Sequence, residues 1–238
     1  MASAFAFFEL NVHAPFYAKL NEELGIATDE FYTSYVNDPV LHDRMTFIGA
    51  MLEDEDELLS LAAFTMLEGA VLYSSFAFLK HFQSNGKNKL MNLVRGINFS
   101  VRDENLHSEA GAWLFKKVRD ELKLTKKQLT ALVAKINACA LKVFDHESRI
   151  VDMIFEQGEI PGITADDLKA FVKHRINFCL SNLEIEPVFT AEETANSIEE
   201  WFYKGINDFQ FNDFFSGVGN QYNRNWEKAG FIWKGKAL

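Results

Sequence analysis

The sequence predicts an all-α protein that folds as a single helical domain over residues 1–238, with a short C-terminal tail from about residue 227. Only 4 Pro and 13 Gly interrupt the 238 residues, and no run of alternating β-branched residues indicates a strand. Signals for helix starts recur, and Thr125-Lys126-Lys127-Gln128 has the form of a capping box. No linker or internal repeat divides the chain, which favours one domain.

Turn and cap residues set the expected helix boundaries. Gly25 ends the first helix, Asn37-Asp38-Pro39 stops the second, and Ser84-Asn85-Gly86-Lys87 is a turn before the fourth. The acidic run at residues 53–57 is interpreted as a solvated helix face or a loop, and residues 183–193, with Pro187, as irregular. We expect helices over about residues 3–24, 28–35, 40–82, 90–122, 126–158, 164–182, 196–204 and 211–225.

Composition and charge exclude several functions. The formal net charge is −10 and Lys and Arg form no dense cluster, so neither nucleic acid nor an anionic membrane is an expected partner. No apolar run reaches the length that spans a membrane, and residues 1–8 lack the basic leader of a signal peptide. Cys139 and Cys179 lack the spacing of a metal site, and we interpret them as small buried residues. Free cysteines of this kind are typical of a reducing compartment, so we expect a cytoplasmic protein.

Three helices carry carboxylates and imidazoles in apolar surroundings. Glu104 and His107 stand three residues apart, and Glu9 and His13 stand four apart, so each pair lies on one helix face. Glu68 lies in an apolar run, where an unpaired carboxylate is costly and a bound cation would remove the cost. The alternative for Glu68 is an arginine partner or a narrow polar stripe, and a Glu-x-x-His pair also arises often by chance.

Taken together, these residues match a dinuclear metal bundle. Such bundles use one Glu from each of two helices and Glu-x-x-His from each of two others, and five of the six ligands have candidates here. Carboxylate and imidazole ligands suit iron or manganese. The turn near Gly86 is short enough to make the helices of Glu68 and Glu104 antiparallel neighbours.

At these positions the chain resembles the small, radical-generating subunit of class I ribonucleotide reductase. The resemblance rests on EGAVLYSSFAF at residues 68–78, VRDENLH at 101–107 and HAPFY at 13–17. A looser match is NDFF at 212–215, followed by Gln221-Tyr222. The resemblance covers nearly the whole chain, from Phe7 to Trp226.

The resemblance implies a ferritin-like helical bundle with extra C-terminal helices, a homodimer, and a dinuclear iron or manganese site that oxidises a tyrosine. The oxidising equivalent would then pass to a cysteine in a separate large catalytic subunit, where ribonucleotides are reduced. Tyr17 is the radical candidate, and Asp103 would couple the His13 side of the site to the transfer route. The implied metal ligands are Glu9, His13, Glu68, Glu104 and His107.

Two positions depart from the family pattern. The family has a glutamate three residues before the ligand histidine, where this chain has Leu10, and a one-residue bulge in the helix would bring Glu9 into register. Without such a bulge, Glu9 is not a ligand. The family also carries a first carboxylate ligand before the first helix, with no counterpart here, so the chain is a fragment or half of a split subunit, or another residue completes the site.

Two other functions remain open at this point. A ferritin- or rubrerythrin-like iron oxidase would use the same ligands, although about 130 residues after His107 exceed what a bare four-helix bundle needs. A metal-deficient or split form of the reductase subunit, which only pairs with an active partner, would explain the missing first carboxylate.

Overall fold

The computed structural model describes residues 6–7, 9–204 and 206, and within them it is helical with no strand, which confirms the all-α prediction. In chain order the elements are a π-helix, η1 (Glu9–His13), then α2 (Ala14–Glu23), α3 (Asp29–Asn37), α4 (Pro39–Leu52), α5 (Glu57–Gly69), α6 (Tyr73–His81), a 3₁₀ turn, η2 (Ser84–Gly86), α7 (Met91–Leu122), α8 (Lys126–Phe155), α9 (Ala165–Asn182) and α10 (Glu199–Phe202).

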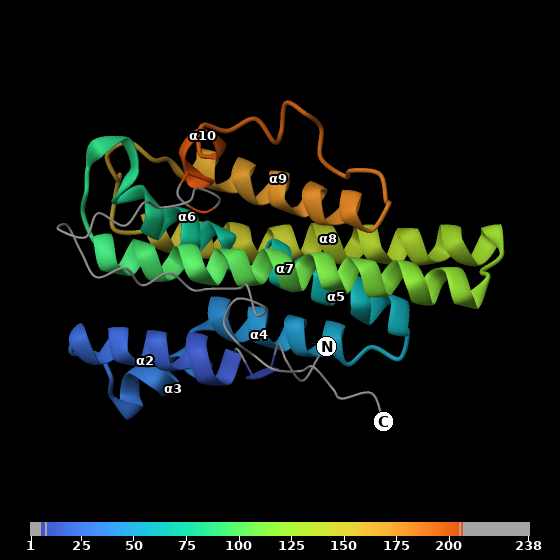
Figure 1. The fold of residues 1–238 in the computed structure, drawn as a ribbon, viewed down its shortest axis with the longest axis horizontal. Helices are drawn as coiled ribbons and strands as arrows, with labels where there is room; N and C mark the ends of the chain where they lie inside the picture. Colours follow the sequence, from blue (N-terminus) through green and yellow to red (C-terminus); the bar gives the residue numbers. More distant parts are fainter. Residues whose placement is uncertain (1–5, 8, 205, 207–238) are drawn as a thin grey trace, which may run out of the picture.

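Helix α5 is the centre of the bundle. It packs against α4, α7, α8 and α9, and its most extensive contact is with α7. Figure 1 shows α5 and α7 running in opposite directions, with α2 to α4 on one side of α7 and α9 and α10 on the other. The buried core contains Ala62 and Met66 of α5, which pack with Ile136 of α8 and Ile176 of α9. The predicted antiparallel pairing of the helices that carry Glu68 and Glu104, α5 and α7, is confirmed by this arrangement.

Several predicted helix starts are confirmed with their caps. Thr28 Oγ1 accepts from Phe31 N at the start of α3, and Thr164 Oγ1 accepts from Asp167 N at the start of α9. Thr125 and Gln128 form the predicted capping box of α8. Short-range hydrogen bonds of this kind are visible in the sequence because both partners lie within one turn.

The predicted helix over residues 40–82 is wrong, because this segment forms three helices. The acidic run forms the first break, as the loop interpretation required: Asp54 Oδ1 accepts from Asp56 N, and Asp56 caps α5. At the second break Leu72 adopts a left-handed conformation with φ of 73°. There, Glu147 of α8 accepts hydrogen bonds from the Leu72 backbone and from Ser74 Oγ. A residue far away in sequence thus satisfies the groups that the break releases.

The C-terminal helices are only partly described. The helix predicted at 196–204 is shorter, because Asn196 Oδ1 accepts from Ile198 N and Glu199 N and the helix begins after this turn. The helix predicted at 211–225 and the tail from about residue 227 lie outside the described residues. The single domain over residues 1–238 stays a prediction.

One stretch, residues 57–86, is apolar enough by length and composition to cross a membrane, and its most apolar 18-residue window has a mean hydropathy of 1.4. It contains two separate helices, α5 and α6, and 61% of its most apolar window is buried inside the bundle. Burial of this kind is typical of the core helix of a globular protein, and the absence of a membrane partner stays a prediction.

Lys80 of α6 is a buried cation away from the candidate ligands. It is 4% exposed, its Nζ donates to Asn98 Oδ1, and it lies 5.4 Å from the centre of the Phe202 ring. Burial, and to a smaller extent the charge of Arg102, lowers the pKa of Lys80 from 10.5 to about 8. Between about pH 8 and pH 10.5, Lys80 therefore binds a proton more often in the unfolded chain than in the folded protein. The contribution of Lys80 to the free energy of unfolding rises with pH through this range.

We expect Lys80→Met to have a larger free energy of unfolding than the unsubstituted protein, and we expect this difference to be larger at pH 7 than at pH 9. This difference should fall by roughly 1 kcal/mol from pH 7 to pH 9, as Lys80 loses its proton in the folded state. Urea unfolding of both proteins at the two pH values measures it. Lys126→Met, at an exposed position, is the control and should show no such change. If the difference in unfolding free energy between Lys80→Met and the unsubstituted protein were the same at pH 7 and pH 9, the prediction would be wrong.

Candidate metal centre

The buried face of α7 carries four of the polar residues at the centre. Ser100, Asp103, Glu104 and His107 are all buried and recur at helical spacing. Glu104 and His107 face the end of α5, as their three-residue spacing predicted. This face therefore presents acidic and imidazole groups toward the inside of the bundle.

Close packing of α5 on α7 brings Glu68 to this face. Gly69 permits the approach, because a Cβ at this position would lie 2.4 Å from Ser108 Oγ and equally near Cys179 Sγ. The Glu68 Oε2 atom lies 2.9 Å from His107 Nδ1, and Glu104 Oε2 lies 3.3 Å from the same nitrogen. Ligand atoms of these three residues all lie within 4.8 Å of one another.

The predicted helix bulge is present as a π-helix at Glu9–His13. Pro15 follows within the first turn of α2, and it has no N–H for the carbonyl of Asn11, which favours a departure from the α-helical pattern. The wider turn places Glu9 Oε1 2.8 Å from His13 Nδ1. Glu9 is therefore in register with His13 despite the four-residue spacing.

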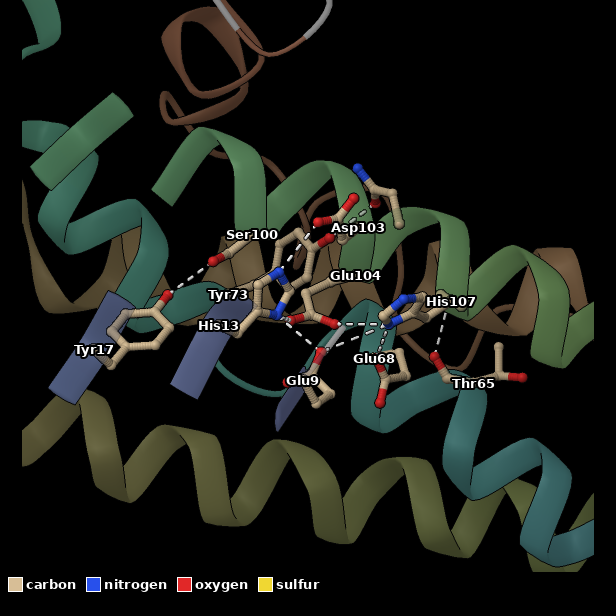
Figure 2. A network of polar contacts seen from close by, with 12 residues as sticks. Glu9, His13, Tyr17, Thr65, Glu68, Tyr73, Ser100, Asp103, Glu104 and His107 are labelled. Atoms are coloured by element: carbon tan, nitrogen blue, oxygen red, sulfur yellow. Dashed lines mark hydrogen bonds and ion pairs between the residues drawn. The ribbon is translucent and has the colours of Figure 1, made fainter. Parts of the chain in front are cut away.

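Glu104 joins the two groups of side chains. Its Oε1 lies 3.4 Å from His13 Nδ1, while its Oε2 faces His107. Glu9, His13 and Glu104 form a second group whose ligand atoms lie within 4.8 Å of one another. Figure 2 shows Glu9, His13, Glu68, Glu104 and His107 pointing toward one another. One carboxylate that belongs to two adjacent groups of carboxylates and imidazoles is compatible with a dinuclear metal site.

The donor atoms fit a cation. Glu9 Oε1 and His13 Nδ1 are buried and lie 2.8 Å apart, within ion-pair distance, but neither forms a well-aligned hydrogen bond with the described residues. Buried polar atoms that lack a well-aligned hydrogen bond are rare, and here both are directed at one region that Glu104 also faces. Carboxylate oxygens and imidazole nitrogens are the ligands of iron and manganese. The residues present therefore fit such metals.

The electrostatics of the protein groups also favour a cation. Burial lowers the pKa of His13, but hydrogen bonds with Asp103 and the other nearby carboxylates outweigh it and raise this pKa to about 12. Burial also lowers the pKa of His107, but hydrogen bonds with Glu104 and Glu68 outweigh this effect and raise the pKa to about 9. The carboxylates thus stabilise positive charge at both imidazoles, and divalent cations would supply it in place of protons.

The two central carboxylates differ in acidity. Burial raises the pKa of Glu68 to about 7, even though His107 opposes the shift. Burial acts in the same direction on Glu104, but hydrogen bonds with His107 and His13 hold its pKa at about 2. Glu104, placed between the two imidazoles, is therefore the carboxylate that keeps its charge.

Asp103 orients His13. The His13 Nε2 atom lies 3.1 Å from Asp103 Oδ2, so in the neutral imidazole that a metal requires, an Nε2–H donor would leave the Nδ1 lone pair directed toward Glu9 and Glu104. A carboxylate behind a histidine commonly fixes its tautomer in this way. The structure thus brings Asp103 to the His13 side of the site.

We expect Asp103→Asn to weaken metal binding by about 10- to 100-fold. The asparagine Nδ2 would donate to His13 Nε2, which places the proton on Nδ1 and blocks the atom that faces the other ligands. Calorimetric titration with Mn(II) measures the change. Asp120→Asn, at an exposed position on the same helix, is the control. Unchanged affinity in Asp103→Asn would show that Asp103 does not select the tautomer.

Tyr17 lies one turn beyond His13, as predicted. Its hydroxyl is 3.1 Å from Ser100 Oγ, and burial raises its pKa, so the side chain is a neutral phenol. The Phe16 ring packs edge-on against it with 5.0 Å between ring centres. Figure 2 shows Tyr17 and Ser100 together at the end of the site next to His13.

A cavity of about 490 Å³ adjoins Tyr17 and the candidate ligands. Except for Ser75, its wall away from the candidate ligands consists of apolar side chains that do not exchange protons with a phenol, and its polar edge is formed by candidate site residues. The lining residues are Leu10, Ala14, Leu72, Ser75, Phe76, Leu79 and Ile97, with Glu9, His13, Tyr17 and Glu104. Phe16 packs against Tyr17 and Phe76 lines the same cavity, so both rings are placed to shield the Tyr17 phenol.

Comparison with known proteins identifies the family. The profile of the family described as ribonucleotide reductase, small chain, matches residues 1–197. The chain belongs to this family. Its described residues have the ferritin-like fold of these small subunits, which confirms the predicted fold class.

Two relatives illustrate the similarity to the small-chain family. The Escherichia coli protein named ribonucleoside-diphosphate reductase 2 subunit beta is 29% identical over 214 residues, which cover 89% of this chain and 64% of that protein. A probable small subunit from Invertebrate iridescent virus 3 is 28% identical over 169 residues, 71% of this chain and 43% of its own length. The chain thus spans 43% and 64% of these two relatives.

Solved structures show the same fold. A putative class I ribonucleotide reductase from Bacillus halodurans superposes with a TM-score of 0.72 at 24% identity, covering 86% of this chain and 73% of that one. The Streptococcus sanguinis dimanganese(II)-NrdF superposes with a TM-score of 0.68 at 22% identity, covering 80% of this chain and 66% of its own.

All seven predicted site residues meet in one region, although their chemical roles stay predictions. No role was predicted for Ser100, the hydrogen-bond partner of Tyr17. Ser100 lies four residues before Glu104 and therefore on the same face of α7, so the spacing alone could have placed it beside the candidate site. The cavity was not predicted from the sequence, and Leu72 reaches its wall through the break between α5 and α6.

Proposed function

We propose that the chain is the radical-generating small subunit of a ribonucleoside-diphosphate reductase, which supports reduction of ribonucleotides to deoxyribonucleotides. The observation that supports this most strongly is the position of Glu104, shared between the groups around His13 and His107. The family match favours this function over iron storage by a ferritin- or rubrerythrin-like protein.

The proposed site holds two metal ions. Glu9, His13 and Glu104 would hold one, and Glu68, Glu104 and His107 the other. Both iron and manganese suit these ligands, and the similar Streptococcus sanguinis protein is described as dimanganese(II). When bound, such a pair supplies one-electron oxidising power after reaction with oxygen or a related oxidant.

Tyr17 is the proposed radical residue. Because burial keeps the phenol neutral, its one-electron oxidation releases the proton from Oη, where the hydroxyl of Ser100 is the neighbouring hydrogen-bond partner at 3.1 Å. Leu72, Phe76 and the rest of the apolar cavity wall would protect the radical, because these side chains donate neither protons nor electrons readily. Asp103 would link His13 to the transfer route.

The proposed assembly follows from the subunit names. The Escherichia coli relative is named subunit beta, and a separate large catalytic subunit is the partner that we propose for this chain. We also propose a homodimer and a cytoplasmic location, with neither nucleic acid nor a membrane as partner. The net charge of −10 supports the last point.

Metal reconstitution tests the proposal. The chain is loaded with Fe(II) or Mn(II), exposed to an oxidant, and examined by metal analysis and electron paramagnetic resonance. We expect two metals per chain and a tyrosyl signal, and with a large reductase subunit we expect deoxyribonucleotide formation. Loading far above two metals would instead indicate iron storage, and absence of tight binding would indicate a metal-deficient or split subunit.

A further inference from the structure

Arg175 of α9 is a buried cation outside the set of candidate ligands. It is 2% exposed, and its guanidinium stacks 4.1 Å from the centre of the Tyr73 ring. No carboxylate among the described residues forms an ion pair with it, and its hydrogen-bond acceptors are all neutral. An unpaired buried charge is costly, so packing alone would favour an apolar residue here.

The hydrogen bonds of Arg175 reach both helices that carry the second ligand group. Its Nε donates to Gly69 O at 2.8 Å, and Gly69 directly follows Glu68. Its Nη2 donates to Asn105 Oδ1 at 2.8 Å, and Asn105 directly follows Glu104. One rigid guanidinium thus bonds to the backbone next to Glu68 and to the side chain next to Glu104.

The same contacts are reinforced from α6. The Tyr73 hydroxyl donates to Asn105 Oδ1 at 2.8 Å, so this oxygen accepts two hydrogen bonds and the amide is held in one orientation. The third donor of Arg175, Nη1, bonds to Tyr203 Oη at 3.0 Å, beyond α10 and away from the ligand-bearing helices. Arg175 therefore has two contacts beside the candidate ligands and one contact directed elsewhere.

We propose that Arg175 is a positioning residue of the metal centre, which holds Glu68 of α5 and Glu104 of α7 at the separation that the second metal requires. The proposal rests on the proposed function and concerns the same site. The fork geometry matters because a planar guanidinium makes several hydrogen bonds in fixed directions, whereas a lysine ammonium does not.

Substitutions at the hydrogen-bond partners of Arg175 test the proposal. Asn105→Ala removes the contact beside Glu104 together with the hydrogen bond from Tyr73, so Tyr73→Phe, which removes the Tyr73 bond alone, separates the two effects. Tyr203→Phe removes the contact on the opposite side of the same guanidinium. In titrations of the whole chain with Mn(II), we expect Asn105→Ala to weaken binding of the second metal by about 10-fold or more, as loss of supporting contacts commonly does. Tyr203→Phe should stay within about twofold of the unsubstituted protein.

Electron paramagnetic resonance separates a positioning role from a general loss of structure. The unsubstituted protein should show an exchange-coupled Mn(II) pair, whereas Asn105→Ala and Arg175→Met should show isolated Mn(II) at about one per chain, with helical circular dichroism unchanged. Arg175→Lys should resemble Arg175→Met, because the charge remains but the fork is lost. If Arg175→Met does not fold, the comparison of Asn105→Ala with Tyr203→Phe still decides.

The outcomes distinguish this proposal from the proposed function. Coupled pairs in both Asn105→Ala and Arg175→Met would overturn the positioning role alone and leave the dinuclear site intact. Full recovery by Arg175→Lys would show that charge suffices, and equal losses in Asn105→Ala and Tyr203→Phe would show a nonspecific effect. If the unsubstituted chain binds no metal pair, the proposed function and this inference fail together.

Discussion

Replacing Glu104 with alanine is expected to abolish binding of both metals, with a loss of affinity of ~100-fold or more, while the chain remains folded. The reason is geometric, since Glu104 Oε1 faces His13 Nδ1 at 3.4 Å and Oε2 faces His107 Nδ1 at 3.3 Å. No other carboxylate among the described residues belongs to both ligand groups. Metal analysis after Mn(II) loading and gel filtration measures the loss.

The control for this variant is Glu109→Ala. Glu109 lies on α7 one turn and one residue beyond Glu104 but is exposed, so its removal should leave both metals bound. Helical circular dichroism should be unchanged in both variants, because the core contacts between α5 and α7 do not depend on either carboxylate. Loss of helix in Glu104→Ala would identify the Glu104 contacts as structural ion pairs instead of a metal site.

Local signals in the sequence were sufficient for most helix boundaries and for the ligand pairs. Thr125 and Gln128 cap α8 within one turn, and the spacing of Glu104 and His107 defines one face of α7. The bulge at Glu9–His13 was also accessible, because the register of these two residues required it and Pro15 favours it locally. Interactions that span fewer than five residues can be read directly from spacing.

The break between α5 and α6 depends on tertiary contacts and could not be read in this way. Nothing near Leu72 predicts a left-handed backbone, and the group that stabilises this conformation, Glu147, lies on α8. The contacts of Arg175 with Gly69 and Asn105 join segments that are distant in sequence. Such contacts are a consequence of packing, so a single sequence reveals candidate ligands more readily than the residues that would hold them in place.

Tyr17→Phe is expected to eliminate the tyrosyl radical while both metals remain bound. Phenylalanine retains the ring that packs against Phe16 but lacks the hydroxyl that lies 3.1 Å from Ser100 Oγ. A benzene ring is far harder to oxidise than a phenol, so deoxyribonucleotide formation with a large subunit should fall to background. Electron paramagnetic resonance after oxidant addition, combined with metal analysis of the same sample, measures both expectations.

Tyr32→Phe provides the comparison for Tyr17→Phe, because Tyr32 is exposed on α3 and is absent from both ligand groups and from the cavity wall. The radical signal should be unaffected in this control. A full tyrosyl signal in Tyr17→Phe would assign the radical to another tyrosine, and the buried ring of Tyr73, five residues after Glu68, would then be the next to replace. Since Arg175 stacks on that ring and its cation opposes removal of an electron, we expect Tyr73 to remain reduced and Tyr17 to be the residue oxidised.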